Sequence, residues 1–305
     1  MRKFTLFVAV FSLVIGTSAA LAQENPFKVK GDNGETVRVL PTPASAQAHE
    51  IHGDGPQIPT AQNGLSVFTA SYGSIPGQMN DHGGAVVSNA AFLPIFYNGA
   101  TAASLQSGID AFVNNFSNSV PGMTVITQYS KTGNAISAAL THLPDFVDTQ
   151  AAPRRISDSG VQSYLTGLFN AAKIPVSTST IYGVYLPQGT VSTLGSSRSC
   201  TSYCGYHGSY TYNGNTILYA VLPYNDCSGC SLSGKTVLDM MTIVTSHEIR
   251  EAITDPVNAW WESSSGYEAD DKCAWHNLYQ QTGGAWVQPE FSNALAGWPL
   301  GCVTP

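Results

Sequence analysis

Apolar and polar positions along this chain follow two alternating patterns, one typical of strands and one typical of helices. Runs rich in Val, Ile, Phe and Tyr predict strands at 85–97, 123–129, 178–186 and 216–224. Apolar residues at helical spacing predict three helices, at 104–115, 157–172 and 236–253. The segment between the last two strands is rich in Gly, Ser, Cys and Tyr, and we expect a loop there. Because strands alternate with helices, the pattern indicates an α/β fold with a mixed β-sheet and packed helices.

Residues 1–22 have the pattern of a cleavable secretory signal peptide. A basic start precedes an apolar run at 4–15, and a small-x-small sequence follows at 20–22. The run is too short to span a bilayer as a mature helix, and no later segment approaches the roughly 20 apolar residues that a span needs. We therefore expect a secreted or periplasmic protein without a membrane span.

The segment at 23–65 has a different composition from the rest. It contains Pro, Gly, Gln and Asn without hydrophobic periodicity, which predicts a flexible leader or a removable pro-segment. We expect a single folded domain at 66–305. Its tail from Gly283 is rich in Trp, Gly and Pro and is predicted to form short strands that end near Cys302.

The charge of the chain excludes one class of partner. Charged residues make up 11% of the sequence, and the formal net charge is −7. The few Lys and Arg residues are scattered, whereas a protein that binds nucleic acid presents a clustered basic face. We therefore expect no nucleic-acid partner, and the low charge suits a secreted, loop-rich globular protein.

All the cysteines lie in the second half of the chain. An even number in an exported protein predicts three disulfides, although the spacing leaves their pairing open. A four-thiolate zinc site or a redox-active CxxC is less favoured, because both are rare outside reducing compartments. The six residues are Cys200, Cys204, Cys227, Cys230, Cys273 and Cys302.

The stretch Val237–Asp255 contains the strongest candidate chemistry. Its first half is apolar, as in a helix that crosses a core, and its second half contains the sequence HEIRE. His247 and Glu251 are four positions apart, so both side chains project from one helix face and can bind one metal ion. Glu248 lies one position further round, where its carboxylate can take a proton from water. This is the logic of the HExxH metallopeptidases with glutamate as the second ligand, and it predicts a zincin-like active helix.

A metal site of this kind needs a third protein ligand. Glu268 and Asp271 follow Glu251 at distances of 17 and 20 residues, and they share a face if their segment is helical. In thermolysin-like enzymes the third ligand is a downstream glutamate, and a neighbouring aspartate orients a ligand histidine. By analogy we predict Glu268 as ligand and Asp271 as the orienting group, with the two roles open to exchange. His276 and His207 are alternative ligands.

The ligand set predicts Zn²⁺, with Ca²⁺ as the alternative. One imidazole and two carboxylates neutralise a divalent cation, which weakens its pull on water relative to a site with two histidines. Histidine is in turn a poor ligand for the hard Ca²⁺ ion. Two function classes stay open. One is a zinc-dependent hydrolase that acts on a peptide or protein substrate, and the other is a non-catalytic extracellular protein with a structural ion or none.

Several segments in this order resemble the EXORDIUM / phosphate-induced protein 1 family. They are LPIFYNG at 93–99, CTSYCGYHGSY at 200–210, NDCSGC at 225–230, SHEIREAITDPVNAWW at 246–261 and YEADDKC at 267–273. The resemblance covers roughly residues 85–302. It implies an extracellular, cell-wall-associated protein, with a cell-wall component as the alternative partner. Arg250 stands where a small or apolar residue is more usual in this motif, so we expect it to reach solvent or to pair with an acid such as Glu262.

Overall fold

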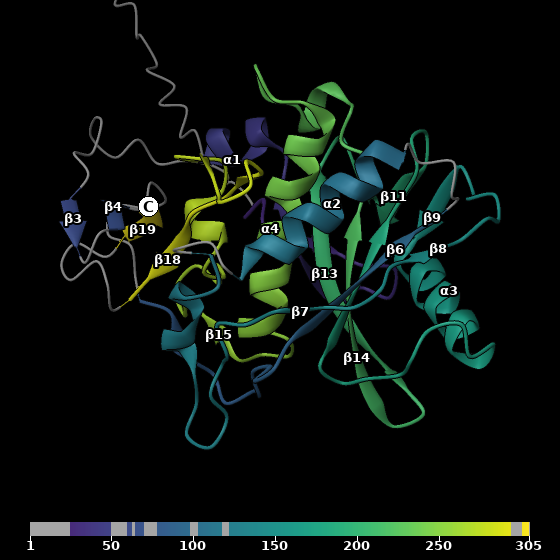
Figure 1. Ribbon diagram of the computed structural model, residues 1–305, viewed down its shortest axis with the longest axis horizontal. Coiled ribbons are helices and arrows are strands. Elements are labelled where there is room, and N and C mark those ends of the chain that lie inside the picture. The colour runs from purple at the N-terminus through teal and green to yellow at the C-terminus, as the bar shows by residue number, and fades with distance from the viewer. Residues whose placement is uncertain are drawn as a thin grey trace, which may run out of the picture.

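The computed structural model describes most of the chain after the predicted signal peptide, which itself lies outside the described residues. The described ranges are 25–49, 60–62, 65–69, 78–97, 103–117, 122–293 and 301–304. Within them, helices pack on both faces of a mixed β-sheet, which confirms the predicted α/β class (Figure 1). No helix in these ranges is long and apolar enough to cross a membrane.

The central sheet has the strand order β1-β2-β13-β14-β10-β6-β7, with β8 also pairing with β6. The strands from β14 to β7 and β8 pair in parallel, whereas β1, β2 and β13 are antiparallel additions at one edge. Their bounds are β1 Lys28–Lys30, β2 Thr36–Pro41, β6 Ala91–Phe96, β7 Thr141–His142, β8 Phe146–Val147, β10 Thr180–Tyr185, β13 Tyr203–Tyr212 and β14 Asn215–Leu222.

Smaller sheets surround the central one. The tail strand β18 pairs with β19, which pairs with β4, and β4 pairs with β3; this confirms short strands near Cys302. The remaining strands are β3 Thr60–Gln62, β4 Leu65–Thr69, β5 Asn80–Asp81, β9 Arg155–Ser157, β11 Val191–Leu194, β12 Ser197–Arg198, β15 Trp260–Trp261, β16 Tyr279–Gln280, β17 Trp286–Val287, β18 Glu290–Ser292 and β19 Gly301–Thr304.

The three predicted long helices are confirmed as α2 Ala103–Phe116, α3 Asp158–Asn170 and α4 Val237–Thr254. Helix α3 begins where the Ser157 side chain accepts a hydrogen bond from the Gly160 amide, and α4 begins at a capping box between Thr236 and Asp239. The short helices are α1 Pro43–His49 and the 3₁₀ segments η1 Val125–Tyr129, η2 Ser228–Cys230 and η3 Asp271–Cys273. The strand predicted at 123–129 is therefore wrong, because η1 occupies it.

The sheet separates two apolar cores. Helices α2 and α4 pack on one face with Phe92, Phe96 and Tyr185, and α3 covers the other face with Tyr182 and Val184 (Figure 1). Helix α4 runs through the first core, and every residue from Met240 to Thr254 is buried. A polar residue in the second half of α4 is therefore surrounded by protein rather than by water.

The predicted loop between β10 and β14 contains the strand β13. It forms a hairpin with β14 through Asn213 and Gly214, which have φ values of 48° and 78°. An Asn-Gly pair with positive φ at both positions is the favoured two-residue hairpin turn, because its twist matches that of the flanking strands. The loop prediction is therefore wrong for 203–212, because the Asn-Gly turn places this segment in the sheet as β13.

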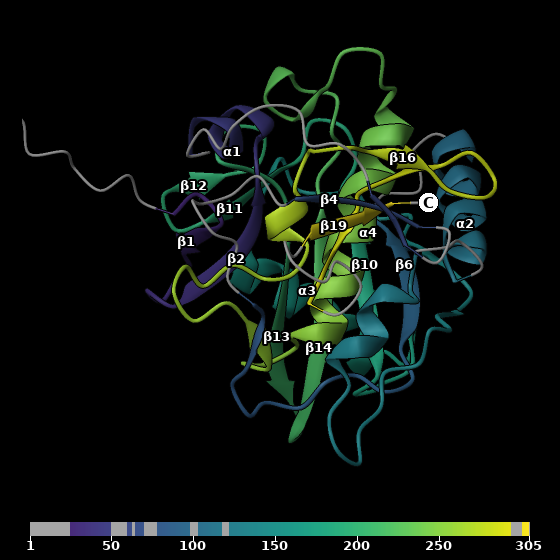
Figure 2. The same ribbon diagram turned by 90° about the vertical axis from the view of Figure 1, so that its left-hand side faces the viewer.

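The predicted leader also contributes to the sheet. Strand β2 pairs antiparallel with β13, and Phe27, Val39 and Leu40 are at most 1% exposed (Figure 2). The prediction that folded structure begins near residue 66 is therefore wrong for residues 25–49. The alternation in TVRVLP at 36–41 is a strand signal, but it is only a few residues long.

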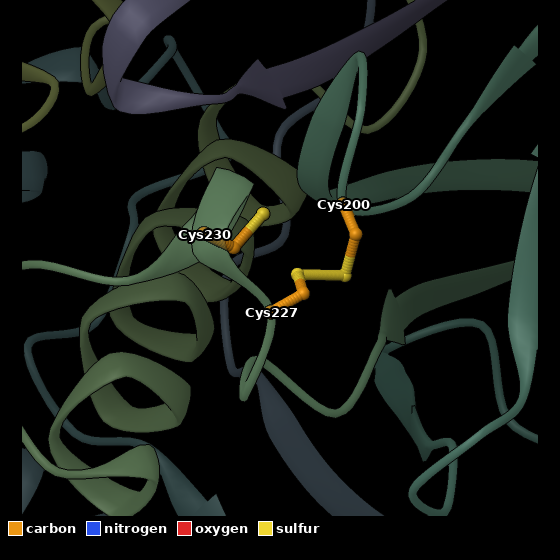
Figure 3. Close-up of side chains that lie close together, drawn as sticks. All are labelled: Cys200, Cys227 and Cys230. Carbon is orange, nitrogen blue, oxygen red and sulfur yellow. A yellow bond between two sulfur atoms is a disulfide. The ribbon is translucent and has the colours of Figure 1, made fainter.

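The predicted disulfides are confirmed as Cys200–Cys227, Cys204–Cys230 and Cys273–Cys302. Figure 3 shows the first bond, with Cys230 beside it. The first two connect the start of β13 to η2, and the third connects η3 to β19. All six sulfur atoms are bonded in pairs, so the alternative of a four-thiolate zinc site does not apply.

Replacing Leu40 tests whether the leader belongs to the folded unit. We expect Leu40→Ala to lower the free energy of unfolding by about 2–5 kcal/mol, because it removes buried methyl groups and leaves a cavity. Urea denaturation followed by circular dichroism measures the change. The control Lys30→Ala, at an exposed position of β1, should stay within about 0.5 kcal/mol of wild type. Equal small effects of both substitutions would contradict the assignment.

Candidate metal centre

Six of the seven residues named from the sequence as ligand, base or orienting group lie together in one buried cluster. They are His207 on β13, His247, Glu248 and Glu251 on α4, Glu268 in the turn before η3, and Asp271 at the start of η3. Each is at most 6% exposed. The seventh, His276, is half-buried, its amide donates to the Cys273 carbonyl, and it belongs to neither ligand group described below.

The first ligand group contains His247, Glu251 and Asp271. His247 Nε2 lies 2.9 Å from Glu251 Oε2 and 3.7 Å from Asp271 Oδ1. Despite these distances, His247 Nε2 and Asp271 Oδ1 make no hydrogen bond within the described residues. The Asp271 amide donates to Glu251 Oε1 at 3.0 Å, which fixes that carboxylate. Buried polar atoms that face one another without hydrogen bonds are expected where a cation is coordinated.

The second ligand group contains His207, Glu251 and Glu268. Opposite ring nitrogens of His207 lie 3.7 Å from Glu251 Oε2 and 3.6 Å from Glu268 Oε1. Neither carboxylate oxygen of Glu268 makes a hydrogen bond within the described residues. Asp271 therefore stands beside His247, and Glu268 beside His207. Which of Glu268 and Asp271 is the ligand and which the orienting group stays a prediction. Glu268 is in an irregular turn, so the helical spacing expected for the pair does not apply.

Burial and like charge shift the pKa values of the cluster. Burial, His207 and Arg250 lower the pKa of His247 well below its usual value, so this imidazole is neutral and in the form that binds metals. Burial, Asp271 and Glu268 raise the pKa of Glu251 well above its usual value. Burial and the charge of Glu268 likewise raise the pKa of Asp271 well above its usual value. The cluster cannot keep all its carboxylates ionised without additional positive charge.

His207 and Glu248 form a hydrogen-bonded pair inside the cluster. His207 Nδ1 donates to Glu248 Oε2 at 3.2 Å, and Glu248 Oε1 has no hydrogen-bond partner in the described part of the chain. Burial opposes the charged form of His207, but Glu268 and Glu248 together raise its pKa to about 10. Burial raises the pKa of Glu248 to about 7, although the His207 hydrogen bond opposes the shift.

Gln288 contacts the second ring nitrogen of His247. Its Nε2 lies 3.2 Å from His247 Nδ1 and donates to the Asp270 carbonyl oxygen at 2.6 Å. With an amino group facing Nδ1, the ring proton belongs on Nε2, toward Glu251. Metal binding through Nε2 requires the proton on Nδ1 instead. The Gln288 amide oxygen, which has no hydrogen-bond partner in the described ranges, can accept that proton only if the amide turns and gives up its hydrogen bond to the Asp270 carbonyl oxygen.

Arg250 lies next to the cluster and is fully buried. Its Nη2 donates to Asp270 Oδ2 and to the Gln288 carbonyl at 2.7 Å, and its Nε lies 3.0 Å from Glu290 Oε2. The expectation that it reaches solvent or pairs with Glu262 is wrong, since Glu262 pairs with Lys272. Arg250 instead ties α4 to the turn before η3 and to β18.

Arg38 on β2 covers the opposite side of the cluster. It pairs with Asp255 at the end of α4, and its Nε lies 3.5 Å from Glu268 Oε2. A cavity of about 210 Å³ opens here, and its lining includes Arg38, His207, Asp255 and Gln162. The cluster therefore meets the cavity at His207, and a strand of the predicted leader forms part of the cavity wall.

Sequence reasoning did not identify Arg38, Asp255, Gln288 or Glu290 as neighbours of the cluster. These residues come from β2, the end of α4 and the segment around β18, far apart in the chain. A buried Arg inside an apolar helix was the one available signal, because it demands acidic partners. Comparisons with protein-family models, with curated proteins and with solved structures found no match. The EXORDIUM resemblance therefore stays an expectation based on motifs.

Removing the Arg250 cation tests its structural role. We expect Arg250→Met to lower the free energy of unfolding by about 3–5 kcal/mol, because it leaves the buried Asp270 and Glu290 carboxylates without their cation. Urea denaturation measures the loss. Arg155→Met is the matched control, since Arg155 is exposed, and it should change stability by less than about 0.5 kcal/mol. Equal stability of the two variants would show that the ion pairs do not hold α4 in place.

Proposed function

We propose that this protein is a secreted metal-dependent hydrolase with a zincin-like site, and that a zinc peptidase is the first candidate. The observation that carries the proposal is the first ligand group. His247 Nε2 and Glu251 Oε2 lie 2.9 Å apart, and Asp271 Oδ1 lies 3.7 Å from the same nitrogen, with no hydrogen bond at His247 Nε2 or Asp271 Oδ1 in the described ranges. The disulfides support a location in an oxidising compartment.

The chemistry of this group fits a divalent transition metal. Zn²⁺ binds His and carboxylate ligands at about 2.0–2.2 Å, so two ligand atoms on a tetrahedral ion are about 3.3–3.5 Å apart. The two His247 distances lie on either side of this value. Neutral imidazole suits Zn²⁺ better than the hard Ca²⁺ ion, although Ca²⁺ accepts the carboxylates. A bound divalent ion supplies Lewis acidity for attack on a carbonyl group.

Glu248 is the residue that we assign as general base. Its pKa of about 7 lies near neutral pH, where a base can both take up and release a proton. Glu248 Oε2 is held by His207, so Oε1 is the oxygen directed to a proton on water. His207 holds this carboxylate in place and lines the cavity through which a peptide carbonyl can approach.

The second candidate function is a non-catalytic extracellular or wall-associated binding protein of the EXORDIUM type. The observation that favours it is burial, because His247, Glu248 and Glu251 are at most 1% exposed. A closed ligand set is typical of structural metal sites, whereas a catalytic site keeps an open position. In this case an ion would fasten α4 to the segment around η3.

Replacing Glu248 separates the two functions. We expect Glu248→Gln to lower peptide turnover by about 10²–10⁴-fold, since the amide cannot take up a proton, while metal content and melting temperature stay near wild type. A fluorogenic peptide library measures turnover. Asp145→Asn, at an exposed position outside the cavity wall, should keep wild-type activity. Equal turnover in wild type and Glu248→Gln would exclude this residue as the base.

Metal analysis tests the site independently of activity. We expect the purified wild-type protein to contain zinc, and His247→Ala to contain less zinc per chain because the first ligand group is lost. Plasma mass spectrometry after dialysis measures the zinc content. His276→Ala is the matched control and should retain wild-type zinc, because His276 lies in neither ligand group. Folded wild type that stays free of zinc after zinc is supplied would overturn the hydrolase proposal. Calcium in its place would make the role structural.

A further inference from the structure

Glu251 is shared by the two ligand groups. Its Oε2 lies 2.9 Å from His247 Nε2 and 3.7 Å from His207 Nδ1. The two imidazoles nevertheless fall in different groups, His247 with Asp271 and His207 with Glu268. Oε1 accepts from the Asp271 amide, so Oε2 is the oxygen that faces both imidazoles, and its two lone pairs allow one carboxylate oxygen to bridge two ions.

Formal charge indicates how many cations the cluster needs. Nearby acids outside the cluster already have cations, since Arg250 pairs with Asp270 and Glu290, and Arg38 pairs with Asp255. Inside the cluster, four carboxylates remain, and burying uncompensated charge is costly. With His207 neutral, as a metal ligand must be, and Arg38 shared between Asp255 and Glu268, one divalent ion leaves two of these negative charges and two divalent ions leave none. The four carboxylates are those of Glu248, Glu251, Glu268 and Asp271.

Each group has its own buried atoms without hydrogen bonds. The first has His247 Nε2 and Asp271 Oδ1, and the second has both carboxylate oxygens of Glu268, which is fully buried. In the second group Glu248 accepts from His207 Nδ1 and orients the ring, which leaves Nε2 facing Glu268 Oε1 at 3.6 Å. A carboxylate that orients a histidine in this way is typical of metal ligands.

We infer that the centre binds two divalent cations, the second among His207, Glu251 and Glu268, with Glu251 as the shared ligand. The inference rests on the proposed metal site at His247 and extends it. The Arg38 guanidinium does not fill the site of the second ion, because it approaches Oε2 of Glu268 while Oε1 of Glu268 faces His207. The second ion is the one nearer the cavity, since His207 lines it. Paired ions with a carboxylate bridge suit Zn²⁺ or Mn²⁺.

Metal stoichiometry tests the inference. Native mass spectrometry of the full-length secreted protein, titrated with Zn²⁺ alone, should show two ions per chain. His207→Ala and Glu268→Gln should each bind one ion, and so should His247→Ala. The control His142→Ala, at a histidine in neither group, should still bind two. Melting curves confirm that each variant is folded, and Glu268→Gln keeps the side-chain volume if His207→Ala does not fold.

The outcomes distinguish this inference from the proposed function. In the alternative result, wild type binds a single ion that His247→Ala loses and that His207→Ala and Glu268→Gln retain. That result would overturn the inference of a second ion and leave the proposed first site in place. No ion in wild type would overturn both. As a second measurement, Mn²⁺-loaded wild type should give the electron paramagnetic resonance signal of an exchange-coupled pair. Folded His207→Ala or Glu268→Gln should give the signal of an isolated Mn²⁺ ion. An isolated-ion signal from fully loaded wild type would contradict the inference of two neighbouring ions.

Discussion

The burial of several carboxylates beside two imidazoles is the constraint on which the rest of this structure depends. An ionised side chain loses several kcal/mol of hydration when it enters a protein core, and like charges at close range add to the loss. The fold compensates around the cluster with the buried Arg250 and the half-buried Arg38. Arg250 neutralises acids on the η3 side, and Arg38 neutralises Asp255 on the cavity side. Among the carboxylates between them, Glu268 lies near Arg38 and His207, whereas Glu251 and Asp271 have only imidazole nitrogens as basic groups within 4 Å in the described chain.

The frame of the protein holds the ligand-bearing elements at fixed separations. Helix α4 is fastened at its start by the Thr236 capping box and packs on β13, β14 and β10, so His247 and Glu251 cannot shift along the sheet. The two disulfides near the start of β13 and the third at η3 fix the segments that carry His207 and Asp271. Metal sites need donor atoms held with little freedom, and rigid strands and helices meet that need better than loops do.

Local patterns predicted the parts of the fold that depend on local forces. The capped, apolar α4 and its HEIRE sequence were visible because helical spacing and capping are encoded within a few residues. The antiparallel strands β2 and β13 were not, since they gain their stability from each other across a long stretch of chain. Arg38 reaches Asp255 through that same pairing. Which of Glu268 and Asp271 stands beside His247 also depends on an irregular turn, and helical spacing carries no information about it.

The place where the cluster meets solvent limits what the site can do. The cluster residue in the cavity wall is His207, and Glu251 stands between His207 and His247. An ion held by His247 and Asp271 alone would therefore act on substrate only through the Glu248 and His207 pair in front of it. An ion at His207 and Glu268 would face the cavity directly. Glu248 connects the two sides of the cluster, because His207 holds its Oε2 while its Oε1 has no hydrogen-bond partner in the described ranges. The proposed base therefore stands between the buried first group and the cavity.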